Sequence, residues 1–90
     1  MDTTEELIIA ASEGNLEKVK YLLEQGANIN AYDYLALRLA CENGYLDLVK
    51  YLVKKGTDIH TDYVVPLRLA CENGHLHIVK YLVDQGVNIH

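Results

Sequence analysis

A spacing of 30 residues between glycines constrains the fold of this chain more than any other feature of its sequence. The six glycines form two series with this step: Gly14, Gly44 and Gly74, and then Gly26, Gly56 and Gly86. Longer segments share the step, because 17 of the 25 residues in 36–60 are identical to their counterparts in 66–90. A fixed period of about this length is typical of repeat proteins, in which each small unit packs on the next. We therefore divide the single domain into units of residues 1–30, 31–60 and 61–90.

Each unit has the pattern of two helices. In the middle unit, Leu46, Val49 and Leu52 recur at helical spacing and form an apolar stripe that ends before Gly56. The pattern predicts first helices over about 5–13, 35–43 and 65–73, and second helices over about 16–25, 46–55 and 76–85. One helix pair cannot cover its own apolar stripe, so the pairs must stack. The sequence therefore predicts an all-α solenoid of three antiparallel helix pairs with short loops between the units.

Two local signals mark helix starts. Thr3 and Glu6 fit a capping box, which would let the first helix begin without a preceding unit. Pro66 falls in the first turn of its helix, where a missing N–H costs little. Both signals agree with the helix boundaries that the period indicates.

The third unit resembles the ankyrin repeat. Ala70 and Cys71 are the small residues that close the first helix, and Gly74-His75-Leu76 has the family's turn pattern. An aliphatic-Lys second helix follows, and Gly26-Ala27-Asn28-Ile29-Asn30 is the best copy of the family's closing stretch. The resemblance covers essentially the whole chain. It implies a module without a cofactor, which contacts a protein partner through its loop tips and exposed first-helix surface.

The sequence departs from the family pattern in two ways. Its period is 30 residues, whereas the family period is 33. The loop segments 31–34 and 61–64 lack glycine, so we expect short loops in place of the family's tight hairpin. Arg38 and Arg68 also stand where the family has a histidine that ties neighbouring units. This compact form is similar to ankyrin proteins of giant DNA viruses of amoebae, although a designed or excised fragment would look alike.

Charge and composition argue against several classes of function. The net charge is −5, and basic residues are scattered singly apart from Lys54-Lys55, which disfavours nucleic acids and anionic membranes as partners. No apolar run approaches the roughly 18 residues of a membrane helix. The acidic start at residues 1–6 does not resemble a secretory signal, although a mature domain would look the same. With two cysteines and no disulfide framework, we expect a reducing cytoplasm, that of the host if the protein is viral.

Cysteine and histidine positions do not indicate a metal or redox site. Cys41 and Cys71 are equivalent, and packed helices lie about 8–10 Å apart, whereas a disulfide needs Cα atoms within about 7 Å. We expect both thiols to be buried and inert. His75 and His77 are two residues apart and would point to different sides of a helix. We therefore expect no metal site.

The sequence also lacks a catalytic pattern. Ser12 is the only serine, the glycines are all assigned to helix ends, and the carboxylates are scattered over solvated helix faces. Without a pocket, no carboxylate pair has the surroundings that split its pKa values. We therefore expect no enzymatic activity.

The candidate binding residues lie mainly where the copies differ. They include tyrosines, which are favoured interface anchors. The set is Tyr32, Asp33, Tyr34, Arg38, Tyr45, Asp62, Tyr63, Val64, Arg68 and His75. For the two arginines, which are identical between the copies, a scaffold role is favoured over partner binding, either through the glutamate four residues later or through the neighbouring unit. The tyrosines could instead pack on the next loop.

Two further expectations concern contacts between units. Tyr21, Tyr51 and Tyr81 form a ladder on the second helices, which we expect to pack between units. No polar unit covers the third repeat, so an open apolar end is expected to include Leu67, Leu69, Val79 and Leu82. Weak self-association through this C-terminal repeat is therefore an alternative function.

Overall fold

The computed structural model describes residues 2–56 and 64–86, which form six α-helices and no strand. The helices are α1 (Thr3–Glu13), α2 (Leu16–Glu24), α3 (Ala31–Asn43), α4 (Leu46–Lys55), α5 (Val64–Glu72) and α6 (Leu76–Asp84). Their bounds agree with the predicted ones to within about two residues, except at the start of α3. None of these described helices combines the length and apolar character needed to cross a membrane. The predicted all-α fold is confirmed.

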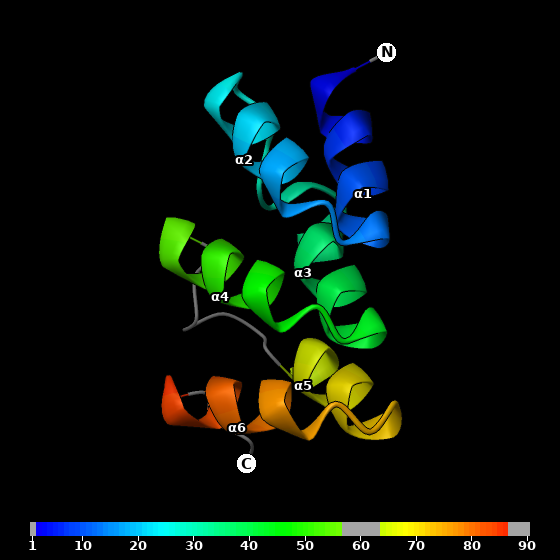
Figure 1. The fold of residues 1–90 in the computed structure, drawn as a ribbon, viewed down its shortest axis with the longest axis vertical. Helices are drawn as coiled ribbons and strands as arrows, with labels where there is room; N and C mark the ends of the chain where they lie inside the picture. Colours follow the sequence, from blue (N-terminus) through cyan, green and yellow to red (C-terminus); the bar gives the residue numbers. More distant parts are fainter. Residues whose placement is uncertain (1, 57–63, 87–90) are drawn as a thin grey trace.

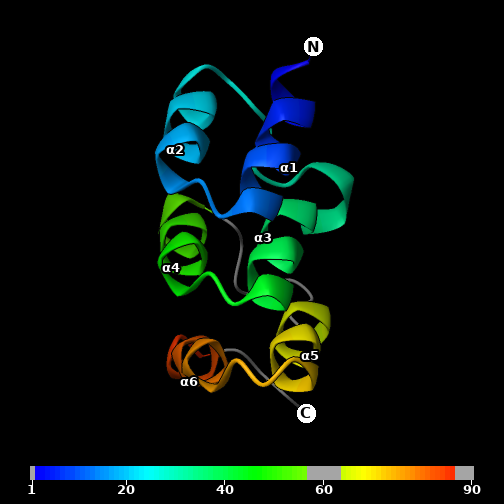
Figure 2. The same ribbon diagram turned by 45° about the vertical axis from the view of Figure 1, so that its right-hand side comes forward.

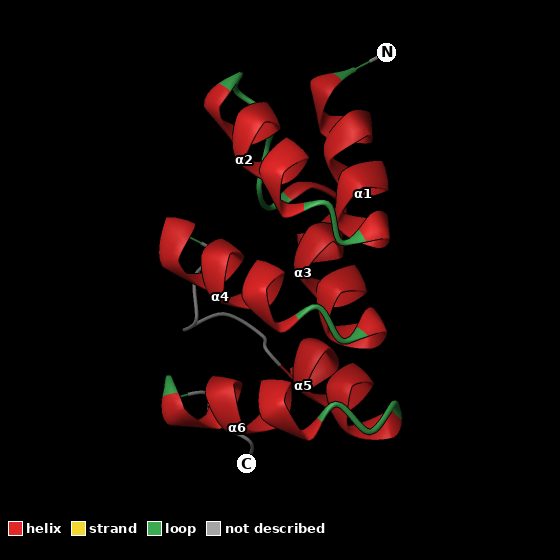
Figure 3. Ribbon diagram, viewed as in Figure 1, coloured by secondary structure: helices red, strands yellow, loops and turns green. Residues whose placement is uncertain are grey.

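The helices stack in two layers along an elongated molecule of 38 × 23 × 18 Å. The first helix of each pair belongs to one layer, in which α1 contacts α3 and α3 contacts α5 (Figure 1). The second helices α2, α4 and α6 form the other layer, as the turned view in Figure 2 shows. Short loops join the two helices of each pair (Figure 3). This arrangement is the predicted solenoid of three stacked pairs.

The turn inside each pair closes in the same way. Gly14, Gly44 and Gly74 all adopt the left-handed conformation, with φ between 71° and 83°. The N–H of the residue after each glycine donates a 2.9 Å hydrogen bond to the carbonyl of an alanine five residues earlier. Glycine suits this helix ending because it has no Cβ to clash in the left-handed region. The repeated glycines therefore set the angle at which each second helix leaves the first.

The core runs through the stack without interruption. Small residues on the first helices, Ala10, Ala40 and Ala70, are almost fully buried and let α1, α3 and α5 approach closely. Larger aliphatic side chains fill the space between the two layers. The largest fully buried side chains are Leu7, Val19, Leu37, Cys41, Leu48, Val49, Leu52, Ile78 and Leu82. Burying one such aliphatic side chain contributes roughly 1.5–3 kcal/mol, so the core is the main source of stability.

The start of α1 differs from the predicted capping box. Asp2 is the N-cap, and its carboxylate accepts a 3.1 Å hydrogen bond from the Thr4 N–H. Thr3 is already helical, so its predicted capping role is wrong. The Thr4 hydroxyl instead accepts a 3.3 Å hydrogen bond from the Asn28 N–H. This bond ties the start of α1 to the segment that follows α2. Pro66 does lie in the first turn of α5, as predicted.

Candidate functional site

The first turn of α3 is left-handed. Tyr32, Asp33 and Tyr34 have φ values of 54°, 58° and 62°, and they are the only described residues other than glycine with positive φ. The left-handed conformation costs an L-residue roughly 1–2 kcal/mol, so three in succession need support from their surroundings. The predicted short loop is thus a single left-handed turn, which extends α3 four residues before its expected start.

Arg38 supports this turn from the next stretch of α3. Its Nε donates to the Asp33 carbonyl and its Nη2 to the Tyr32 carbonyl, both at 3.0 Å. The Tyr34 N–H also donates to the Asn30 carbonyl at 3.2 Å. The planar guanidinium suits this task because its donors point in fixed directions. Arg38 therefore serves the turn, and not the intrahelical pair suggested by its spacing.

Arg68, the equivalent residue on α5, does form the expected intrahelical pair. Its Nε lies 3.6 Å from Glu72 Oε1, and both side chains are more than half exposed. An exposed pair of this kind contributes only a few tenths of a kcal/mol. The same residue type in the same local sequence thus has two different roles.

The turn meets the start of the next unit. Asp33, Tyr34 and Arg38 border a small hollow together with Val65 and Pro66 of α5. The sequence-based set did not include Val65 and Pro66, because their helix-start pattern says nothing about which loop they touch.

Some of the other predicted binding residues near this turn belong to the described part of the chain. Tyr32 is 58% exposed and Val64 48% exposed, and Arg68 is exposed one turn further along α5. We call Tyr32, Asp33, Tyr34, Arg38, Val64 and Arg68 the loop surface. The predicted binding residues Asp62 and Tyr63 lie outside the described residues.

Tyr45 and His75 lie at the other end of the first helices, where they join units. The Tyr45 hydroxyl donates to the Ser12 carbonyl at 3.2 Å, and His75 Nε2 bonds the Glu42 carbonyl at 3.0 Å. Since a carbonyl can only accept, Nε2 carries the proton. These two side chains therefore tie neighbouring units, a role that the family gives to a histidine elsewhere. A partner contact at these two residues stays a prediction.

The tyrosine ladder also joins units. Lys20 Nζ lies 5.4 Å from the centre of the Tyr51 ring, and Lys50 Nζ lies 5.8 Å from that of Tyr81. A cation over an aromatic ring contributes roughly 0.5–1 kcal/mol at an exposed site. Each lysine thus reaches the tyrosine of the following unit, which confirms the expected packing between units for Tyr51 and Tyr81. Tyr21 is 58% exposed, and the expectation is wrong for this residue.

The two cysteines have different surroundings. Cys41 is fully buried, and this burial raises the pKa of its thiol to about 12. Cys71 is exposed, so its expected burial is wrong. The two positions differ in what packs on them: α5 packs on α3, whereas none of the described helices packs on the far side of α5.

This difference predicts selective thiol chemistry. In the folded protein we expect a disulfide reagent such as Ellman's to modify Cys71 quickly and Cys41 at least about a hundredfold more slowly, since only thiolates react. The release of chromophore would count one fast thiol in buffer and two in denaturant. Cys71→Ser should remove the fast reaction, and a fast reaction that remained in this variant would contradict the assignment.

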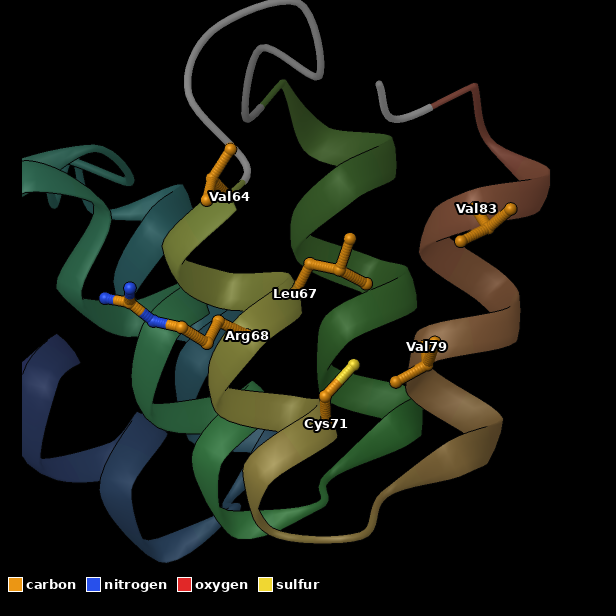
Figure 4. A pocket seen from close by; sticks show the side chains of 6 residues that line it. All are labelled: Val64, Leu67, Arg68, Cys71, Val79 and Val83. Carbon is orange, nitrogen blue, oxygen red and sulfur yellow. The ribbon is translucent and has the colours of Figure 1, made fainter. Parts of the chain in front are cut away.

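An apolar groove of about 320 Å³ opens between α5 and α6 at the end of the stack. Its walls are the side chains that Figure 4 labels: Val64, Leu67, Arg68, Cys71, Val79 and Val83. We call this feature the end groove. Of the residues expected at an open apolar end, Leu67 and Val79 line it, whereas Leu69 does not and Leu82 is fully buried. Leu82 was assigned wrongly because it faces the core between α5 and α6.

The described residues contain no group of His, Cys, Asp and Glu side chains that could hold a metal ion.

Two family models together match residues 2–90. One, described as ankyrin repeats in three copies, matches residues 2–63, and the other, described as an ankyrin repeat, matches residues 64–90. No curated protein matches the chain.

Proposed function

Because the chain belongs to the ankyrin repeat family, we propose that it is a non-catalytic module that binds a protein partner through the loop surface. Ankyrin repeats are generally protein–protein interaction modules. The stacked pairs form a stiff support, from which exposed side chains project at fixed positions. Binding would then need no chemical step and no cofactor.

The observation that carries this proposal is the strained turn at Tyr32, Asp33 and Tyr34. Backbone strain of this kind persists only where the surroundings hold it, and it clusters at binding and switching sites. The two hydrogen bonds from Arg38 stabilise the left-handed turn. A loop fixed before binding loses less entropy on binding, and this raises affinity.

The side chains of the loop surface suit a partner of mixed polarity. Tyr32 offers a large ring with a hydroxyl at its tip and only two side-chain torsions to fix. Asp33 and Arg68 are exposed and carry opposite charges, and the apolar Val64 is exposed as well. We therefore propose a partner surface that combines apolar groups with charged groups of both signs.

A matched pair of tyrosine variants tests the loop surface. The immobilised chain would be used to isolate a partner, whose affinity would then be measured by calorimetry. Replacing both Tyr32 and Tyr34 by alanine should weaken binding by about 30-fold or more, because a lost anchor costs about 2 kcal/mol. Tyr21→Ala is the control, since Tyr21 is equally exposed, at 58%, but lies on α2. Equal affinities for the wild type and the double variant would contradict the proposal.

Self-association through the C-terminal repeat is the second candidate function. The end groove favours it, because an exposed apolar patch is a common place for a partner to bind. Light scattering over a range of protein concentrations tests it directly. A particle mass that stays at 10.1 kDa at every concentration would exclude this candidate.

The exposed thiol of Cys71 fits the reducing cytoplasm that we propose for the protein.

A further inference from the structure

The fold separates the two kinds of basic residue. All six lysines of the chain belong to the second helices, whereas both arginines belong to the first helices. Along the sequence the lysines stand singly, apart from Lys54-Lys55. The second helices α2, α4 and α6 form one layer, so lysines that lie far apart in the sequence share one side of the molecule (Figure 2).

Two of these lysines meet at the ring of Tyr51 on α4. The Nζ atom of Lys20, on α2, lies 5.4 Å from the centre of this ring. The Nζ atom of Lys55, one turn further along α4, lies 5.8 Å from the same centre. An ammonium group over an aromatic ring is attracted by the ring and still carries its charge. We call Lys20, Tyr51 and Lys55 the lysine cluster.

No described carboxylate neutralises the lysine cluster. The described part of the chain forms two ion pairs, Arg68 with Glu72 and Lys80 with Asp84, and neither involves the cluster. Two ammonium groups placed around one ring repel each other. An anionic group between them would attract both, so the cluster is suited to bind an anion from another molecule.

Acidic side chains limit the size of the anionic ligand. Lys54 follows the cluster on α4, but the equivalent residues on α2 and α6 are Glu24 and Asp84, and the net charge of the chain is −5. A nucleic acid or an anionic membrane would extend over these carboxylates and be repelled by them. Since salt screens exposed charges beyond about 8 Å, a short segment crossing α4 would mainly interact with the lysines.

We propose that the lysine cluster binds a short acidic segment of a partner protein, with two or more neighbouring aspartates or glutamates. One carboxylate lies between the ammonium groups of Lys20 and Lys55, and another reaches Lys50 or Lys54, which are exposed on α4. The ring of Tyr51 positions the two ammonium groups. The cluster belongs to α2 and α4, whereas the loop surface belongs to α3 and α5, so this binding does not depend on the proposed function.

A fluorescently labelled peptide of six glutamates is the probe for this surface, and six glutamines are its neutral control. Fluorescence anisotropy should show that the wild type binds only the acidic peptide. Lys20→Gln/Lys55→Gln should weaken this binding roughly tenfold, because two exposed ion pairs are lost. Lys20→Gln alone should weaken it about threefold. Lys18→Gln removes the same charge from α2 away from the cluster and should leave the affinity nearly unchanged.

Two further variants test the ring of Tyr51. Tyr51→Leu keeps every charge but removes the ring, and should weaken binding of the acidic peptide about threefold. Tyr51→Phe keeps the ring and should bind as the wild type does. Circular dichroism would check that both variants are folded. If Tyr51→Phe bound as weakly as Tyr51→Leu, the ring would have no positioning role and that part of the proposal would be wrong.

Three results would overturn the proposal itself. The first is no binding of the acidic peptide by the wild type, and the second is equal binding by the wild type and Lys20→Gln/Lys55→Gln. The third is tighter binding of a single-stranded oligonucleotide, or of phosphatidylserine vesicles, that the same double variant abolishes. Loss of the acidic peptide while the loop-surface partner still binds would leave the proposed function intact.

Discussion

Replacing Leu52 by alanine is expected to remove about 2–5 kcal/mol from the free energy of unfolding. Leu52 is fully buried in α4, which contacts both α3 and α6 at the centre of the stack. The loss combines the transfer free energy of the deleted atoms with the cost of the cavity they leave. Since single domains are usually stable by about 5–15 kcal/mol, this one change would remove a large part of the total.

Urea denaturation followed by circular dichroism measures this loss. The control is Leu76→Ala, which deletes the same atoms from a side chain that is 70% exposed. We expect this second change to alter stability by less than about 0.5 kcal/mol. Similar losses for the two leucines would show that α4 does not lie between two packed neighbours.

Gly44→Ala is expected to cost about 3–5 kcal/mol. Part of this, about 1–2 kcal/mol, comes from placing an L-residue at φ 83°. The rest comes from the His75 ring, which lies 2.6 Å from the position of the new Cβ and must move. Its movement would break the 3.0 Å hydrogen bond to the Glu42 carbonyl, which contributes about 1 kcal/mol, and would disturb tight packing.

Gly74→Ala is the matched control for this prediction. Gly74 has nearly the same backbone conformation, with φ 74°, but no atom lies within 4 Å of the added Cβ. Only the backbone strain remains, so we expect a loss of about 1–2 kcal/mol. Equal losses in urea denaturation would mean that the His75 ring does not rest on Gly44.

Much of the fold was predictable because the period repeats both the apolar stripes and the helix ends. Leu46, Val49 and Leu52 share a face by spacing alone, and glycine after a stripe marks where a helix stops. The predicted solenoid, its helix pairs and the packing of Tyr51 and Tyr81 between units are confirmed for the same reason. The N-cap was harder, since Asp2 and Thr3 are both suitable acceptors next to each other. Which one caps α1 depends on the path of the chain, and local sequence does not fix that path.

The candidate site was predictable only in part. Variation between copies pointed to the loop at Tyr32–Tyr34, and the structure places these residues together with Arg38. The left-handed turn itself was not foreseen, because tyrosine and aspartate have no strong preference for that conformation. Arg38 stabilises it by donating hydrogen bonds to two of its carbonyls, and this depends on where the folded α3 places the guanidinium.

The amino-acid sequence by itself determined which segments become helices and that these pack in pairs with a fixed step. Only the tertiary structure decided the surroundings of residues that the repeat makes equivalent. Cys41 and Cys71 share the same neighbours in sequence, yet one is fully buried and the other lines the end groove. Arg38 and Arg68 likewise hold different partners. The physical reason is that helix formation depends on neighbours along the chain, whereas burial depends on the unit that packs against each face.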